Sequence, residues 1–236
     1  MPAGRRPMRL TSELGARAFR RVPDPGAVEG LVPLDDAEAE AIAARLRAEG
    51  DGPVWVFAYG SLIWNPAFAA AETRRARAHG WHRSFCIDLR TWRGTPEAPG
   101  LMLALAPGGA CVGIACRLDP ETLSADLAGL VRREMPYREL AGNARWITVE
   151  TRGGRLRALT FYASPVGTRV SHGLPPETVA RRLATACGQA GSCAEYLHNT
   201  VGHLEAEGIR DRSLWRLQEL VAAEIAGWAE ADAAGP

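Results

Sequence analysis

The spacing of apolar and polar residues divides the chain into a strand-rich part and a helical part. Between residues 54 and 118, short apolar runs are separated by glycine and proline, a pattern typical of strands and turns. The predicted strands are Val54–Ala58, Ala78–Asp88, Leu101–Leu105, Cys111–Leu118, Arg145–Glu150 and Leu156–Tyr162. From Pro176 onward the apolar residues recur at helical spacing. The predicted helices are Ala37–Ala48, Glu121–Glu134, Glu177–Gly188, Ser192–Glu207 and Asp211–Trp228.

Strands dominate the first two thirds and helices the last third, which predicts an α+β fold rather than a doubly wound sheet. The segment Arg152–Arg155 predicts a hairpin turn between the last two strands, and Asp35 with Asp36 predicts a helix N-cap. Residues 1–35 are rich in arginine, proline and glycine, and we interpret them as a partly ordered arm. We expect an N-terminal arm and helix over residues 1–50 and one globular domain over residues 51–230.

The most unusual feature of the composition is that all 28 basic residues are arginine and none is lysine. This excludes enzymes that need a Schiff-base lysine, a Walker A lysine or a protein-kinase lysine. The formal net charge is only +1, which argues against a nucleic-acid partner, because such proteins usually carry a clustered basic patch.

The sequence also lacks the patterns of membrane and secreted proteins. The longest apolar runs, Val54–Tyr59 and Leu101–Ala106, are far shorter than the roughly 20 residues that span a bilayer. The N-terminal segment has no apolar core of the kind found in signal peptides. The five cysteines form no CxxC pair, which favours reduced thiols. We therefore expect a cytoplasmic protein with no membrane partner.

The first candidate site is the tetrapeptide Tyr59, Gly60, Ser61 and Leu62, which follows the predicted strand Val54–Ala58. Glycine at the end of a strand allows backbone N–H groups to converge into a concave site that binds anions without a basic side chain. The neighbouring tyrosine and serine hydroxyls add further contacts. The alternative is an ordinary turn after a buried strand, and the tetrapeptide alone does not decide between the two.

The second candidate is Glu134, at the end of the predicted helix. It follows Leu127, Leu130 and Val131 at the spacing that places all four residues on one face of the helix. A carboxylate on an apolar face is desolvated, which raises its pKa and suits it to proton transfer near neutral pH. The alternative is a glutamate paired with a nearby arginine (Arg133, Arg138 or Arg145) at a frayed helix end.

Other reactive residues give weaker signals. His198 and His203 are five residues apart on a predicted helix, so they cannot share a face, and we predict no metal site. Cys86, Cys111 and Cys116 lie in apolar strands, where cysteine usually belongs to the core. The glycine pattern of dinucleotide-binding folds is absent.

Several motifs in order carry a resemblance to a known family. The segments VWVFAYGSLIWNP, GWHRSFC, WRGT, PGLMLAL, VRREM, GSCAEYL and GIRD together resemble the ChaC family of γ-glutamylcyclotransferases, over residues 54–220. The resemblance implies a compact mixed β-barrel with flanking helices. It also implies that glutathione is the substrate and is cut to 5-oxoproline and cysteinylglycine, with no metal and no organic cofactor.

The resemblance also implies roles for particular residues. The loop of Tyr59, Gly60, Ser61 and Leu62 cradles the γ-glutamyl group, and Glu134 is the general base and acid. Arg93, in WRGT, matches a family arginine that contacts either the glycine-end carboxylate or the loop, with a surface salt bridge as the alternative. Tyr137 is the expected substrate-binding tyrosine, although the family's tyrosine usually lies further along the chain.

Three positions depart from the family pattern, namely Leu101 in place of arginine, Cys116 in place of tyrosine and Cys193 in place of asparagine. All three bear on contacts with the cysteinylglycine half of the substrate. Two alternatives therefore stay open, a cyclotransferase for other γ-glutamyl amides or amines, and a non-catalytic regulator associated with cation transport. The oligomeric state is not predicted.

Overall fold

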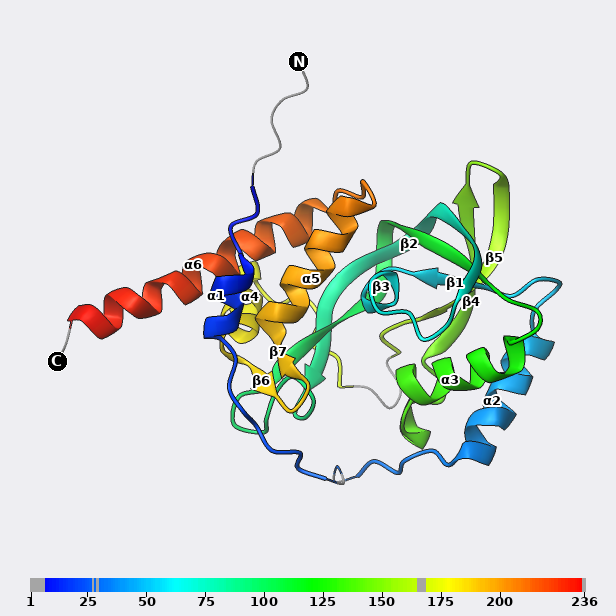
Figure 1. Ribbon diagram of the computed structural model, residues 1–236, viewed down its shortest axis with the longest axis horizontal. Coiled ribbons are helices and arrows are strands. Elements are labelled where there is room, and N and C mark those ends of the chain that lie inside the picture. The colour runs from blue at the N-terminus through cyan, green and yellow to red at the C-terminus, as the bar shows by residue number, and fades with distance from the viewer. Residues whose placement is uncertain (1–6, 27, 29, 165–168, 235–236) are drawn as a thin grey trace, which may run out of the picture. The chain divides into compact units, whose positions relative to one another are not determined.

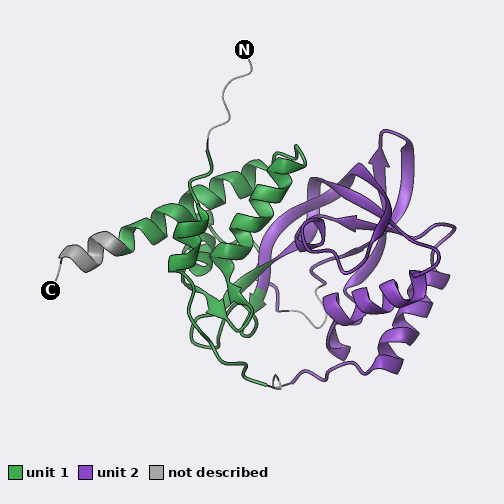
Figure 2. Ribbon diagram, viewed as in Figure 1, with its two compact units in different colours: residues 1–26, 88–102, 171–236 green, residues 27–87, 103–170 purple. Residues whose placement is uncertain are grey.

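The computed structural model describes residues 7–26, 28, 30–164 and 169–234. The chain divides into two compact units, which Figure 2 shows in different colours. One unit, here called the helical unit, consists of residues 1–26, 88–102 and 171–236. The other, here called the barrel unit, consists of residues 27–87 and 103–170. The N-terminal arm and the domain boundary near residue 50 stay predictions. Residues 1–6, 27 and 29 of the arm lie outside the described residues.

Five strands form a closed barrel in the order β1-β3-β2-β4-β5 (Figure 1). The strands are β1 Trp55–Ala58, β2 Ala70–Leu89, β3 Gly100–Leu118, β4 Ala144–Thr151 and β5 Gly154–Phe161. β1 pairs antiparallel with β3 and parallel with β5, so the barrel is mixed. Thr151 pairs with Gly154 at the end of the β4–β5 hairpin, which confirms the predicted turn. The predicted α+β class and mixed barrel are confirmed.

The structure corrects the prediction of separate strands at Leu101–Leu105 and Cys111–Leu118. Both belong to the single long strand β3, which continues through Pro107, Gly108 and Gly109. The two glycines have φ values of +107° and +69°, conformations that glycine adopts at little cost. They form an irregularity within an exposed stretch of the strand rather than a turn that ends it.

The second correction concerns β2, which begins at Ala70 rather than at Ala78. The added segment, residues 70–77, is rich in arginine and contains no large apolar residue, so its sequence does not show the alternation of apolar and polar residues that is typical of a strand. Ala76 and Ala78 are buried, whereas Arg75 and Arg77 between and beside them are exposed. These two inward alanines belong to the buried cluster that contains Phe57.

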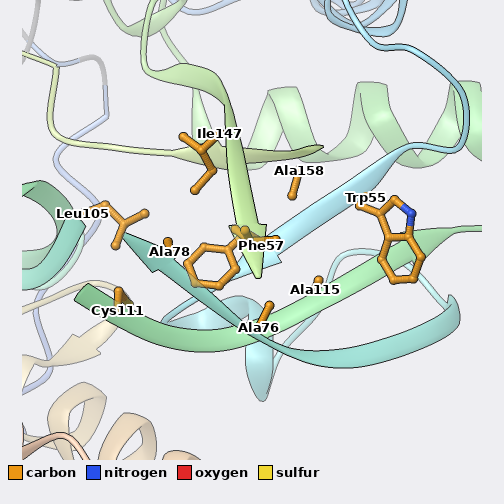
Figure 3. Close-up of a cluster of buried hydrophobic side chains, with 10 residues drawn as sticks. Trp55, Phe57, Ala76, Ala78, Leu105, Cys111, Ala115, Ile147 and Ala158 are labelled. Atoms are coloured by element: carbon orange, nitrogen blue, oxygen red, sulfur yellow. The ribbon is translucent and has the colours of Figure 1, made fainter. Parts of the chain in front are cut away.

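Two aromatic side chains of β1, Trp55 and Phe57, pack with aliphatic and small side chains in the core of the barrel (Figure 3). Phe57 of β1 is fully buried and belongs to the same cluster as Ala76, Ala78 and Ala158. All four residues of β1 are buried, although the strand is short. This packing fixes the end of β1, and with it the start of the loop that follows.

Two helices of the barrel unit pack against each other, α2 Asp36–Ala48 and α3 Leu123–Glu134 (Figure 1). α2 begins with a capping box, in which the Asp35 side chain accepts from the Glu38 N–H and Glu38 reaches back to the Asp35 N–H. The predicted N-cap is therefore confirmed. Two short 3₁₀ helices complete the unit, η1 Ser61–Ile63 and η2 Arg138–Leu140.

The helical unit contains α1 Ser12–Arg17, α4 Pro176–Thr185, α5 Cys193–Ala206 and α6 Arg212–Ala234, with a small sheet of β6 Cys187–Gly188 and β7 Gly191–Ser192. α4 ends three residues before the predicted Gly188, because the chain turns into β6. α1 lies in the segment interpreted as an arm. The buried side chain of Gln218 accepts from the N–H of Leu10 at 2.9 Å, so this segment is tied to α6. No helix among the described residues is long and apolar enough to cross a membrane.

A pair of glycine-to-alanine substitutions tests the packing of β1. A Cβ atom on Gly113 of β3 would overlap the carbonyl oxygen of Ala58 and would lie 2.9 Å from Cζ of Phe57. Gly113→Ala should therefore lower the free energy of unfolding, by about 1–3 kcal/mol, because overpacked cores cost that much. Urea denaturation measures the change.

Gly129→Ala is the matched control, because nothing lies within 4 Å of a Cβ at this position on α3. In a helix interior this substitution should raise the free energy of unfolding by about 0.5–1 kcal/mol. A Gly113→Ala variant as stable as the wild type would show that β1 is not packed tightly against β3.

Candidate active site

The predicted anion-binding loop follows directly on the buried strand β1. It continues as η1, in which the N–H of Ile63 donates to the carbonyl of Gly60 at 2.9 Å. The N–H of Asn65 donates to the carbonyl of Ser61 at 2.7 Å, and the buried side chain of Leu62 anchors the turn. A turn of this kind leaves its first N–H groups, those of Ser61 and Leu62, without a partner within the helix. The loop therefore presents two backbone donors at the end of a rigid strand.

A buried arginine holds the start of this loop against the barrel. Nε of Arg83 donates to the carbonyl of Tyr59 at 2.6 Å, and its Nη2 donates to the carbonyl of Val112 at 2.5 Å. Arg83 lies in the GWHRSFC segment of β2, and only 6% of its surface is exposed. Its guanidinium binds one carbonyl group of the loop and one of β3, so it fixes Tyr59 relative to β3.

Glu134 is the last residue of α3. Leu127, Leu130 and Val131 of this helix are buried, as predicted, and Met135 directly after it is fully buried as well. The side chain of Glu134 is 22% exposed, so the carboxylate lies mostly out of water. The apolar face of α3 therefore carries a carboxylate at its C-terminal end.

Arg133 connects Glu134 to the loop. Its Nε lies 3.1 Å from Oε1 of Glu134, and its Nη2 donates to Oγ of Ser61 at 3.3 Å. Its Nη1 donates to the carbonyl of Asn65. The sequence suggested Arg133 only as an alternative partner for Glu134. The ion pair is present, and the same guanidinium brings Ser61 and Glu134, two predicted site residues, to one place.

Burial raises the pKa of Glu134 above the usual value of a glutamate, and the neighbouring Arg133 guanidinium opposes part of this rise. The C-terminal end of α3 acts in the same direction as burial, because the helix dipole is negative there. A carboxylate of this kind is a stronger base than one in water. It can accept a proton near neutral pH and donate it again.

Arg93 belongs to the helical unit, whereas the loop and Glu134 belong to the barrel unit. Its Nη1 donates to the carbonyl of Ser192 at 2.8 Å and lies 3.2 Å from Oε2 of Glu195. Its guanidinium lies over the ring of Tyr196, with 5.5 Å to the ring centroid. These contacts fix the WRGT segment to the first turn of α5.

Tyr137 lies in the barrel unit, three residues after Glu134. Its backbone forms a bridge with Pro33, and its carbonyl accepts from the N–H of Leu140 at 2.9 Å. The ring is half-buried. The segment that leaves α3 is thus held to the chain that precedes α2.

The cysteines are packing residues. All five are buried and form no disulfide, which confirms the prediction for Cys86, Cys111 and Cys116. Burial raises the pKa of the Cys193 thiol to about 11, so this thiol is poorly suited to nucleophilic attack. Leu101 is buried too, so the three departures from the family pattern lie in the interior.

Across the part of the chain that the structure describes, no group of three His, Cys, Asp or Glu side chains could hold a metal ion.

The chain belongs to the family described as ChaC-like protein, whose pattern matches residues 54–224. A similar protein is the glutathione-specific γ-glutamylcyclotransferase of Escherichia coli strain K12, which is 37% identical over 194 residues. This match covers 80% of the present chain and 82% of the relative. The glutathione-specific γ-glutamylcyclotransferase 1 of Homo sapiens is 30% identical over 158 residues, 64% of the present chain and 70% of the relative.

A solved structure has the same fold. The crystal structure of a yeast γ-glutamyl cyclotransferase specific to glutathione superposes with a TM-score of 0.65. The match covers 74% of the present chain and 97% of the yeast chain, at 20% sequence identity. At this identity the likeness concerns the fold alone.

The raised pKa of Glu134 has a consequence for stability. A carboxyl whose pKa is raised by folding stabilises the folded state below the pKa of the unfolded chain, near 4.3. This stabilisation is lost as the pH rises through the folded-state pKa. Glu134→Gln removes the buried charge. At neutral pH it should therefore raise Tm by about 2–4 °C, the shift that one kcal/mol produces in a chain of this length.

Calorimetry at a series of pH values checks this, and the difference from the wild type should vanish at acidic pH. Glu121→Gln is the matched control, because Glu121 precedes the same helix and is exposed. A lower Tm for Glu134→Gln at neutral pH would mean that the ion pair with Arg133 outweighs the cost of burial.

Proposed function

We propose that this chain is a glutathione-specific γ-glutamylcyclotransferase, which converts glutathione to 5-oxoproline and cysteinylglycine. One observation carries the proposal. The buried carboxylate of Glu134, with its raised pKa, is tied through Arg133 to a loop that presents backbone N–H groups. The names of the relatives support the choice of substrate.

The loop positions the γ-glutamyl group. The α-carboxylate of this γ-glutamyl group accepts hydrogen bonds from the N–H groups of Ser61 and Leu62. The positively charged guanidinium of Arg133 lies nearby, because its Nη2 is 3.3 Å from Oγ of Ser61. Tyr59 and Gly60 shape the entrance to this site at the end of β1. In an α-amino acid the ammonium group and the carboxylate are attached to the same carbon, so fixing the carboxylate also fixes the position of the ammonium group. In this orientation the ammonium group faces Glu134.

The reaction begins with a proton transfer. Glu134 accepts a proton from the α-ammonium group, which leaves a nucleophilic amine. The amine nitrogen attacks the γ-carbonyl carbon of the same molecule and closes a five-membered ring. Because the attack is intramolecular, much of the rate gain comes from positioning rather than from a nucleophilic side chain. The five buried cysteines agree with this route.

The second step uses the same carboxyl group as an acid. The bond between the γ-carbonyl carbon and the cysteine nitrogen breaks as Glu134 returns its proton to that nitrogen. The second proton of the ring nitrogen then passes through the same carboxylate to the released amine, which leaves as an ammonium group. The products are 5-oxoproline and cysteinylglycine, and the atoms balance without water. Tyr137 and Arg93 are proposed to contact the substrate as well. Arg93 would act through its side chain or through the segment that it fixes to α5.

The thiols support a proposal for the cellular location. Five buried cysteines with no disulfide suit a reducing compartment, so we place the protein in the cytoplasm. Glutathione is abundant where thiols are kept reduced. A reducing compartment therefore suits both the proposed substrate and the free cysteines of this chain.

Incubation with glutathione, followed by mass spectrometry of 5-oxoproline and cysteinylglycine, tests the proposed reaction. Glu134→Gln should lower turnover by about 10²–10⁴-fold, the usual contribution of a general base, and should still bind glutathione. Glu121→Gln should keep the wild-type rate, because its carboxylate is exposed and precedes α3.

A Glu134→Gln variant with near wild-type turnover would overturn the role of this residue. Comparison with γ-glutamyl-alanine distinguishes the substrate classes. A rate on γ-glutamyl-alanine above that on glutathione would identify a cyclotransferase for other γ-glutamyl amides. A chain inert toward every γ-glutamyl amide would favour the non-catalytic alternative.

A further inference from the structure

The wall of the barrel unit contains a cavity of about 300 Å³ beside β2 and β4. Its lining includes Trp81 of β2, and Arg145, Ile147 and Glu150 of β4. Among the described residues β2 pairs with β4 at Ala76–Ala78, and Gly80, with a positive φ of +79°, lies two residues further along β2. The two strands therefore separate near Trp81, which explains why a cavity forms there.

The side chain of Arg145 is the most distinctive group in this cavity. Its guanidinium lies over the ring of Trp81 at 5.8 Å and over the ring of Tyr162 at 5.9 Å. The two rings contact each other edge to face, with 5.6 Å between centroids. Within the described ranges, the Arg145 side chain forms no ion pair and no hydrogen bond. Its charge is thus positioned by aromatic rings and remains available to an anion.

This group lies at the same end of the barrel as the loop that follows β1. β1 and β5 run parallel, with Val56 paired to Leu159, so both strands end there. Tyr59 and Tyr162 directly follow those ends. β4 runs antiparallel to β5 and begins at that end, where Arg145 pairs with Thr160. Tyr59, Trp81 and Tyr162 also pack against the same buried cluster.

Two other charged groups that could be considered are already engaged. Glu150 also lines the cavity, but its carboxylate lies 2.8 Å from Nε2 of His79. Arg93, for which the resemblance implies a contact with either the glycine-end carboxylate or the loop, donates to the carbonyl of Ser192 and pairs with Glu195. Arg145 is the cation of the barrel unit that combines aromatic support, an adjoining cavity and a place at the loop's end of the barrel.

We infer that Arg145 binds the terminal carboxylate of the dipeptide that leaves the substrate. The inference rests on the proposed function. The dipeptide spans roughly 7 Å when extended, so its carboxylate lies well away from the scissile bond. Arginine forms paired hydrogen bonds with a carboxylate, and stacking on aromatic rings fixes its orientation in advance. Arg145 thereby selects γ-glutamyl peptides that end in a carboxylate over γ-glutamyl amines and amides.

The test compares two substrates, glutathione and glutathione amidated at its glycine carboxylate. Arg145→Gln should lower kcat/KM for glutathione about 10- to 100-fold, the usual effect of one charged hydrogen-bond partner. KM should rise and kcat should change little, because this contact is the same in the ground state and the transition state. The same variant should leave the amidated substrate nearly unaffected, and Arg145→Lys should restore part of the loss.

Arg155→Gln is the matched control, because Arg155 lines the same cavity, whereas among the described residues the cation–π contacts with Trp81 and Tyr162 come from Arg145. It should leave both substrates unaffected. Equal losses on both substrates, or no loss on glutathione, would overturn the role of Arg145 while the proposed function stands. A wild-type chain that releases no cysteinylglycine would overturn the proposed function, and this inference with it.

Discussion

The contact of Arg133 with both Ser61 and Glu134 is the interaction on which the site depends. One guanidinium carries five donors in a fixed plane, so it can serve a loop and a carboxylate together. It donates to Ser61 and Asn65 across 72 and 68 residues of sequence. It also limits how far burial raises the pKa of Glu134.

The barrel supplies the rigidity that this contact needs. β1 is four residues long and fully buried, and Gly113 lets it lie directly against β3. Arg83 then ties Tyr59 to the same wall. A loop that begins on such a strand has little freedom, so its N–H groups keep their directions when a substrate binds. This pre-organisation is the main contribution a protein can make to an intramolecular reaction.

Features with local causes could be predicted from the sequence. The N-cap at Asp35, the hairpin turn within Arg152–Arg155 and the apolar face of α3 all depend on residues close together in the chain. The continuity of β3 through Gly108 could not be predicted, because barrel pairing overrode a turn signal. The contact of Arg133 with Ser61 and the stacking of Arg145 depend on tertiary structure, and nothing in the local sequence distinguishes these arginines from their neighbours.

The central claim is that the substrate's own amine, rather than water, cleaves the γ-glutamyl bond. Turnover of glutathione in water labelled with ¹⁸O tests this most directly, with the label followed by mass spectrometry of the products. The account predicts 5-oxoproline and cysteinylglycine in equal amounts, both without label. Release of glutamate that carries ¹⁸O in its γ-carboxylate would show hydrolysis and would contradict the account.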